Sequence, residues 1–151
     1  MAAAKALLVM VGGECDPIDM CRPVLGTYAR SVVHLGDLGA GQAAKLLNNS
    51  LFTAHLGLAA STFSVAGSLG LDLDALTDVL SAGSARSYAG EVIANSGRSL
   101  AVMAELAGPL LAKDVGILAA LTDANSPALV QMAAATIDAM HLDDEVLPSA
   151  Q

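Results

Sequence analysis

The sequence predicts a mainly α-helical protein, in which a short strand–helix–strand segment precedes a helical domain built around one long central helix. Hydrophobic residues make up 54% of the 151 residues and aromatic residues only 3%. This composition favours close packing of helices over a β-sandwich. Strand-like runs occur only within the first 35 residues, and the pattern after Gly41 is helical throughout.

The N-terminal segment is expected to be the end of a larger α/β domain. A strand is predicted over 6–11, a helix from Pro17 to about Ala29, and a second strand over 31–35. Asp16 is the expected N-cap of the helix, and Pro17 its first residue, because proline fits the first turn. A unit of this size does not form a stable sheet by itself. Residues 1–36 are therefore interpreted as the tail end of a larger α/β domain.

Residues 37–142 are expected to form the helical domain, and residues 143–151 an acidic tail. Helices are predicted over 40–68, 73–82, 86–96, 109–123 and 126–140. Asp72 is the expected cap of the second, and Pro109 the expected start of the fourth. Small or apolar residues surround the first helix on nearly all sides, so we expect it to be central or packed against another subunit.

Charge and cysteine content exclude several classes of function. The net charge is −8, and the seven Lys and Arg residues are scattered, which argues against binding to nucleic acid or to an anionic membrane surface. Polar residues interrupt the most apolar stretch, 40–68, so we expect no membrane span. Cys15 and Cys21 lack metal-ligand spacing with each other or with a histidine. No metal site is predicted, and both are expected to be reduced thiols of a cytoplasmic protein.

Lys45 is the strongest candidate for a functional residue. It follows a glycine-rich turn, and Asn49 lies four residues later on the same face of the predicted helix. An ammonium group in such apolar surroundings is costly unless a partner or ligand stabilises it. The alternative is a lysine at an exposed edge whose stem covers apolar surface while its charge stays in water.

Two further features leave alternatives open. The Gly36-x-x-Gly39-x-Gly41 turn could present N–H groups to an anion, but by itself it favours a tight crossover that needs positive φ. Its glycine spacing differs from the dinucleotide fingerprint. Lys113 and Asp114 are adjacent on another helix and so do not face each other. Either residue could approach Lys45, or neither.

With these residues assembled, the chain resembles the β-hydroxyacid dehydrogenase family, in particular its 3-hydroxyisobutyrate dehydrogenases, which are related to 6-phosphogluconate dehydrogenases. The resemblance rests mainly on Gly39-Ala-Gly-Gln-Ala-Ala-Lys-Leu-Leu-Asn-Asn49, which looks like the catalytic-helix motif of that family. Weaker support comes from Val9-Met-Val-Gly-Gly13, Ser87-Tyr88 and Leu111-Ala-Lys-Asp114.

The resemblance implies that residues 1–36 are the C-terminal remnant of a dinucleotide-binding domain. It implies that a helical domain of the 6-phosphogluconate dehydrogenase C-terminal type follows, with NAD or NADP as cofactor and a small β-hydroxyacid as substrate. It implies that Lys45 is the general acid/base and that Asn49 binds substrate. Gly39, Gly41 and Gln42 would shape the turn over the substrate, while Lys113 and Asp114 would lie near the cofactor. A homodimer or higher homo-oligomer is also implied.

The sequence departs from the family pattern in four places. The glycine-rich cofactor fingerprint and the Ser-Gly-Gly substrate loop are absent, Ser61 replaces a usual glutamate, and Leu106 replaces a common aromatic residue. We therefore expect about half of such an enzyme, inactive alone. The alternative is a non-catalytic helical module for oligomerisation or binding, derived from the same family.

Overall fold

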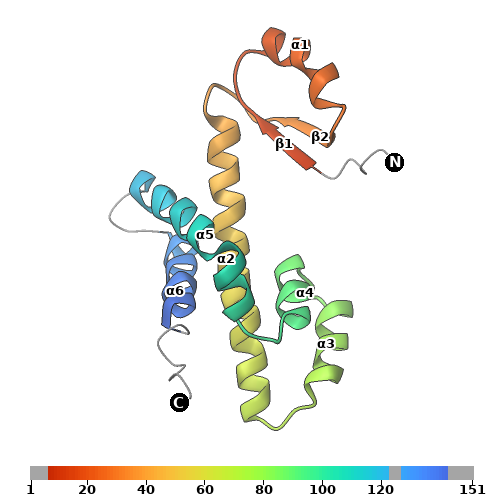
Figure 1. The fold of residues 1–151 in the computed structure, drawn as a ribbon, viewed down its shortest axis with the longest axis vertical. Coiled ribbons are helices and arrows are strands. Elements are labelled where there is room, and N and C mark those ends of the chain that lie inside the picture. The colour runs from red at the N-terminus through yellow and green to blue at the C-terminus, as the bar shows by residue number, and fades with distance from the viewer. Residues whose placement is uncertain (1–6, 123–126, 143–151) are drawn as a thin grey trace, which may run out of the picture. The chain divides into compact units, whose positions relative to one another are not determined.

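The computed structural model describes residues 7–122 and 127–142. Contacts divide the chain into two compact units, Met1–Asn48 and Asn49–Gln151. Their elements, in order, are β1 (Leu7–Val11), α1 (Cys15–Leu25), β2 (Ala29–His34), α2 (Ala40–Ser68), α3 (Leu73–Ala82), α4 (Tyr88–Asn95), α5 (Ala101–Leu121) and α6 (Ala128–Leu142) (Figure 1). The predicted mainly α-helical class is confirmed. The predicted division at residue 36 stays a prediction, and residues 1–6, 123–126 and the expected tail over 143–151 lie outside the described residues.

The first unit contains a two-stranded parallel sheet. β1 pairs with β2 in the register Leu8↔Ser31 to Val11↔His34, and α1 makes the crossover between them. Parallel neighbours need such a crossover because the chain must return to the same end of the sheet. The predicted strand–helix–strand order is therefore confirmed for the described residues.

The start of α1 was predicted wrongly. Its N-cap is Glu14, which makes no side-chain capping bond, and Asp16 lies inside the first turn. Gly13 has φ of 138° and turns the chain, so the helix begins before Asp16. Pro17 occupies the third helical position, where an N–H would have no intrahelical partner in any case. The helix also ends earlier than predicted, with Gly26 as its C-cap.

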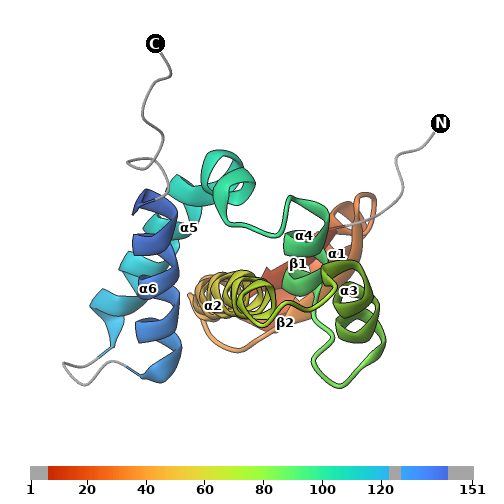
Figure 2. The ribbon, with the colours of Figure 1, turned by 90° about the horizontal axis from the view of Figure 1, so that it is seen from below.

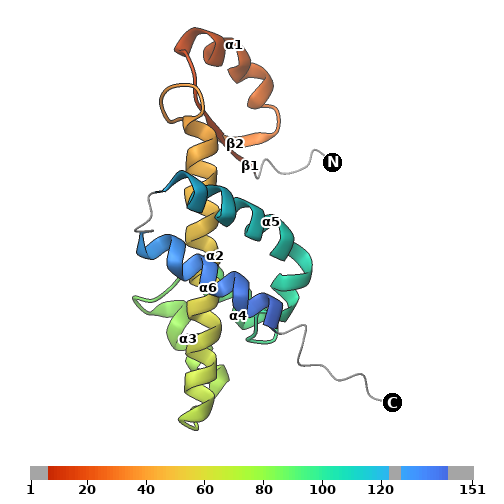
Figure 3. The ribbon, with the colours of Figure 1, turned by 90° about the vertical axis from the view of Figure 1, so that its left-hand side faces the viewer.

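In the second unit, the larger part of α2 lies between two helix pairs. α3 and α4 lie on one side of it, and α5 and α6 lie on the other (Figures 2 and 3). The bounds of α2 and α3 are those that the sequence predicted. Asp72 caps α3 by accepting bonds from the Asp74 and Ala75 amides at 2.9 and 3.1 Å.

The helix containing Pro109 was also predicted wrongly, because α5 begins at Ala101 and places this proline in its interior. An interior proline costs about 3 kcal/mol. The face of α5 beyond it buries Leu111, Val115 and Leu118, and Leu100 is buried just before the helix. Burying each such side chain contributes about 1.5–3 kcal/mol, which offsets the cost. Tertiary packing thus overrides the local signal.

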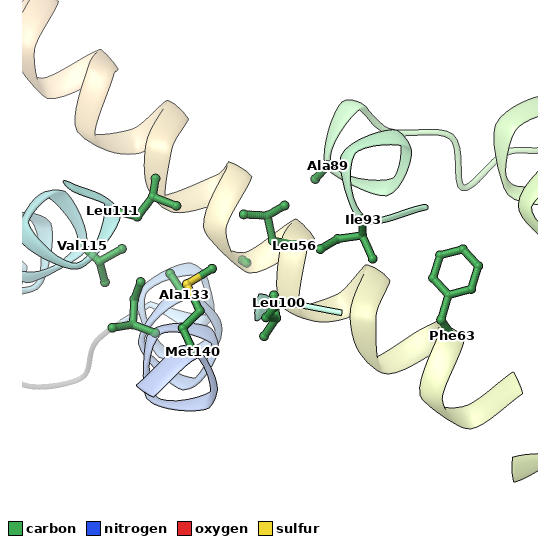
Figure 4. Close-up of a cluster of buried hydrophobic side chains, with 11 residues drawn as sticks. Leu56, Phe63, Ala89, Ile93, Leu100, Leu111, Val115, Ala133 and Met140 are labelled. Carbon is green, nitrogen blue, oxygen red and sulfur yellow. The ribbon is translucent and has the colours of Figure 1, made fainter. Parts of the chain in front are cut away.

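The core of the second unit forms around α2. Leu56 is completely buried and faces Ala89 and Ile93 of α4, as Figure 4 shows. Further core side chains come from α5 and α6, among them Leu111, Val115, Ala133 and Met140. Among the described residues, no helix is both long and apolar enough to cross a membrane.

A close contact between α2 and α6 provides a test of this packing. A Cβ atom at Gly57 would overlap Oγ1 of Thr136 and lie 3.0 Å from its Cβ. We expect Gly57→Ala to lower the free energy of unfolding by about 1–3 kcal/mol, because the helices must move apart. Urea unfolding of the 151-residue chain measures this change.

Gly67→Ala is the matched control on the same helix. A Cβ atom there meets nothing within 4 Å, so the change should raise the free energy of unfolding by about 0.5–1 kcal/mol through helix propensity alone. Equal effects of the two substitutions would contradict the close α2–α6 contact.

Candidate active site

Lys45 and Asn49 both lie on α2, four residues apart. The helical repeat therefore places them one turn apart along the same face of that helix. Both side chains are partly buried, whereas Gln42, one turn before Lys45, is exposed. The contact division falls between these two residues, with Lys45 in the first unit and Asn49 in the second.

Within the second unit, Asn49 is held by a carboxylate from another helix. Its Nδ2 donates a hydrogen bond to Oδ2 of Asp114 on α5, at 2.6 Å. Asp114 is completely buried. A hydrogen bond to an ionised acceptor is shorter and roughly twice as strong as a neutral one. The pair therefore joins α2 to α5 across 65 positions of sequence.

The bond also fixes the orientation of the Asn49 amide. Only the NH₂ group of the amide can donate to Asp114, so this bond identifies which end of the amide is Nδ2 and which is Oδ1. The backbone carbonyl of Asn49 accepts a bond from Oγ1 of Thr53 at 2.8 Å. These contacts restrain both the backbone and the side chain of Asn49.

Two buried hydroxyl residues next to this pair were not predicted from the sequence. Ser50 and Thr53 are completely buried, and Oγ of Ser50 has no hydrogen-bond partner among the described residues. Buried polar atoms without a partner are rare in native proteins. Their position inside an apolar helix, one and four residues after Asn49, was the available signal.

Lys113 and Asp114 differ in their surroundings, as expected for adjacent residues of a helix. Asp114 is buried against Asn49, whereas the side chain of Lys113 is exposed. Asp114 thus bonds to α2 at Asn49, and the approach of either residue to Lys45 stays a prediction. Any contact of Lys113 with a cofactor stays a prediction.

The glycines of the turn have structural roles. Gly39 has φ of 95°, a conformation that favours glycine. A Cβ atom at Gly41 would lie 2.6 Å from the carbonyl oxygen of Met10 and 2.9 Å from Cα of Val11. Gly41 therefore lets the start of α2 approach the end of β1 closely. These observations favour the tight crossover, and a role of either glycine in substrate binding stays a prediction.

The described residues do not form a pyrophosphate site of the dinucleotide type. The residues from Gly39 to Ala44 have the glycine spacing of the G-x-G-x-x-A variant of the dinucleotide fingerprint, although the Gly36-x-x-Gly39-x-Gly41 turn was expected to differ from that fingerprint. However, α2 continues to Ser68 and α3 follows it, so these glycines do not open the βαβ unit that the fingerprint requires. After β1, Glu14 is the N-cap of α1 and Asp16 lies in its first turn, and the charges of these two residues repel phosphate. The exposed ammonium group of Lys113 suits an anionic group.

No cluster of three or more His, Cys, Asp or Glu side chains that could hold a metal ion occurs within residues 7–122 and 127–142. His34 and His55 belong to separate helices or strands. The side chain of His141 lies outside the described residues.

Solved structures provide the first comparison. The chain is similar to a Mycobacterium tuberculosis 3-hydroxyisobutyrate dehydrogenase solved with L-serine, with a TM-score of 0.76 and 29% identity over 96% of this chain and 52% of that one. It is also similar to a protein named Psf3 in complex with NADP⁺ and 2-OPP, with a TM-score of 0.74 and 27% identity over 91% of this chain and 49% of that one.

Curated relatives agree with the solved structures. A probable 3-hydroxyisobutyrate dehydrogenase of Mycobacterium tuberculosis is 39% identical over 88 residues, which are 58% of this chain and 30% of that protein. The NAD-dependent L-serine dehydrogenase of Pseudomonas aeruginosa is 30% identical over 77% of this chain and 41% of its own length. The chain thus spans about half the length of the solved relatives, and its matches cover less than half of these curated ones.

A family model described as the NAD-binding region of NADP-dependent 3-hydroxyisobutyrate dehydrogenase matches residues 39–145. This range begins at the glycine-rich turn and includes Lys45, Asn49 and Asp114. NAD or NADP is the cofactor that the family implies, as the resemblance predicted. Because the model matches more than half of the sequence, the chain belongs to the 3-hydroxyisobutyrate dehydrogenase family of β-hydroxyacid dehydrogenases.

Proposed function

We propose that this chain is the C-terminal part of an NAD(P)-dependent oxidoreductase that acts on a small β-hydroxyacid. The observation that carries the proposal is the hydrogen bond from Asn49 to the buried carboxylate of Asp114. It holds an amide at a defined orientation one helical turn from Lys45. A cation and an oriented amide on one helix face suit a substrate that carries a hydroxyl and a carboxylate.

In this proposal Lys45 is the general acid/base. During oxidation its amine takes the proton of the substrate hydroxyl, and during reduction its ammonium group donates a proton to the carbonyl oxygen. NAD(P), when bound, supplies the hydride chemistry at the carbinol carbon. The helix contributes position, because a proton donor must lie within hydrogen-bond reach of the reacting oxygen.

Asn49 is proposed to bind the substrate through its side-chain amide. Its amide is proposed to orient the hydroxyl or carboxylate group of the substrate, while Nδ2 also donates a hydrogen bond to Asp114. Asp114 is therefore assigned as a positioning residue rather than as a direct ligand of the cofactor. Lys113, which is exposed on the same helix, is proposed to meet an anionic group of the cofactor or substrate. Gly39, Gly41 and Gln42 would shape the turn above them.

The proposed oligomer is a homodimer or higher homo-oligomer. Leu51, Leu58 and Val65 of α2 lie seven residues apart and are 47%, 48% and 54% exposed. Side chains seven apart lie on nearly the same face of a helix, and such a stripe suits a second helix. This stripe also supports the second candidate function, a non-catalytic oligomerisation module.

The proposed location is the cytoplasm. The two free cysteines among the described residues are consistent with it.

The role of Lys45 can be tested in a chimera that joins the nucleotide-binding half of the Mycobacterium tuberculosis relative to this chain. We expect Lys45→Met to lower kcat about 100-fold or more, because it removes the proton donor and acceptor. NADH affinity, measured by fluorescence titration, should not change.

The matched control is Asn48→Ala, because Asn48 is an exposed polar neighbour that lies about 100° away around the helix from Asn49. Its kcat should stay within about twofold of the unsubstituted chimera, in line with the small effects of surface substitutions. Similar kcat values for the Lys45→Met and Asn48→Ala chimeras would remove Lys45 from the proposed role.

Without the other half, the 151-residue chain is expected to be inactive. NADH or NADPH titrated into it, with and without 3-hydroxyisobutyrate, should give no saturable fluorescence change, because the described residues provide no pyrophosphate site. Light scattering should report a dimer or larger species. Saturable cofactor binding would contradict the proposed inactivity, and a monomer would contradict the proposed oligomer.

A further inference from the structure

A cysteine and a histidine meet in the first unit, on elements that do not carry the proposed substrate site. Cys15 is the first residue of α1, and His34 is the last residue of β2. The Cys15 Sγ atom lies 4.0 Å from Nδ1 of His34. Cys15 is exposed and is not part of a disulfide.

The contacts of the other ring nitrogen of His34 show which of its two nitrogens carries the hydrogen. Nε2 lies 2.8 Å from the carbonyl oxygen of Gly13 and 2.9 Å from that of Gly36. Carbonyl oxygens only accept hydrogen bonds, so Nε2 carries the proton and donates it. In the neutral ring Nδ1 is then the nitrogen with the free lone pair. That lone pair faces the thiol of Cys15.

We propose that Cys15 is a modification site that undergoes thiol–disulfide exchange with small disulfides, and that His34 assists it as a base. Nucleophile, base and a group that orients the base are the three parts of an activated nucleophile. Here they are the Sγ atom, the Nδ1 atom, and the two backbone carbonyls that hold the ring. The proposal rests on this pair and its fixed tautomer.

The exchange step balances as follows in atoms and electrons. Sγ of Cys15 attacks one sulfur of the disulfide R–S–S–R, a Cys15–S–S–R bond forms, and the original S–S bond breaks. The thiol proton passes to Nδ1 of His34 and then to the departing sulfur, which leaves as R–SH. Cys15 is oxidised, the departing sulfur is reduced, and His34 returns to its starting state.

The charges around Cys15 select the disulfide. Glu14 and Asp16 flank it in sequence, and both are exposed. Asp19, on the same helix, is paired with Arg22 at 2.7 Å. The two flanking carboxylates attract a cationic reagent and repel an anionic one. The site is therefore expected to prefer a small cationic disulfide such as cystamine over oxidised glutathione.

The position of the site gives the modification a structural consequence. Gly13 and Gly36, whose carbonyls hold His34, lie in the turns that follow β1 and β2. Ligands of open α/β sheets bind outside the carboxyl ends of the strands. A group attached to Cys15 would therefore stand at the edge of the sheet where a ligand would approach.

Cys21 provides an internal control on the same helix. It is also exposed and free. It lies six positions after Cys15 on the helix, a rise of about 9 Å, which is too far for a disulfide between the two. No hydrogen bond from Cys21 to a histidine is present among the described residues.

The test follows formation of the mixed disulfide by intact mass after cystamine is added to the 151-residue chain. The Cys21→Ser variant, which retains Cys15, should react about tenfold faster than the Cys15→Ser variant, which retains Cys21. Cys21→Ser should also react faster with cystamine than with oxidised glutathione. Equal rates for the two variants would overturn the proposal, and a preference for oxidised glutathione would overturn the charge selection.

A third variant separates the role of His34 as a base from its role as a hydrogen-bond donor in the structure. His34→Gln, made together with Cys21→Ser, keeps an amide N–H that can donate to the two glycine carbonyls but removes the basic nitrogen. We expect it to lose the tenfold advantage while its circular dichroism is unchanged. A retained advantage would overturn the role of His34. If the variant does not fold, nitrogen NMR of the Cys21→Ser chain decides: the Nε2–H tautomer supports the assignment, and the Nδ1–H tautomer contradicts it.

Discussion

The candidate site depends on one interaction, the 2.6 Å hydrogen bond between Asn49 of α2 and Asp114 of α5. A carboxylate with no exposed surface is costly to bury unless hydrogen bonds compensate for lost water. The Asn49 amide supplies such a bond, and its own orientation is fixed in return. This polar contact thus joins two helices and fixes the orientation of the Asn49 amide.

The glycine-rich motif consists of a close turn followed by a regular helix. Gly41, and Gly12 opposite it, allow the start of α2 to pass close to the end of β1, where a Cβ atom at Gly12 would lie 2.8 Å from the Ala40 nitrogen. Lys45 and Asn49 come one and two turns later, where the helix is regular. The glycines that the close approach requires and the residues proposed to act on a substrate therefore lie in successive parts of one short segment.

Local signals predicted the elements that have clear start and stop residues. The bounds of α2 and α3 follow from small residues and from Asp72 as a capping side chain. The same rules failed at Pro17 and Pro109, where proline lies inside a helix rather than at its start. Burial of apolar residues on both sides of Pro109 determines where α5 begins. Such burial depends on distant parts of the chain.

The site was predictable only in part, for a similar reason. The four-residue spacing of Lys45 and Asn49 follows from the helical repeat and needs no tertiary information. The partner of Asn49 is 65 positions away, so the sequence left the approach of Asp114 open. Ser50 and Thr53 were missed because short hydroxyl side chains are common in helices of all kinds, and their burial is a property of the fold.

The most direct test of the central interaction is a double-mutant cycle on the 151-residue chain, with Asn49→Ala, Asp114→Ala and the double variant. Urea unfolding would supply the three changes in free energy. If the bond joins α2 and α5 as described, the two residues should be coupled by about 1–3 kcal/mol. Additive effects of the two substitutions, with coupling near zero, would contradict the account.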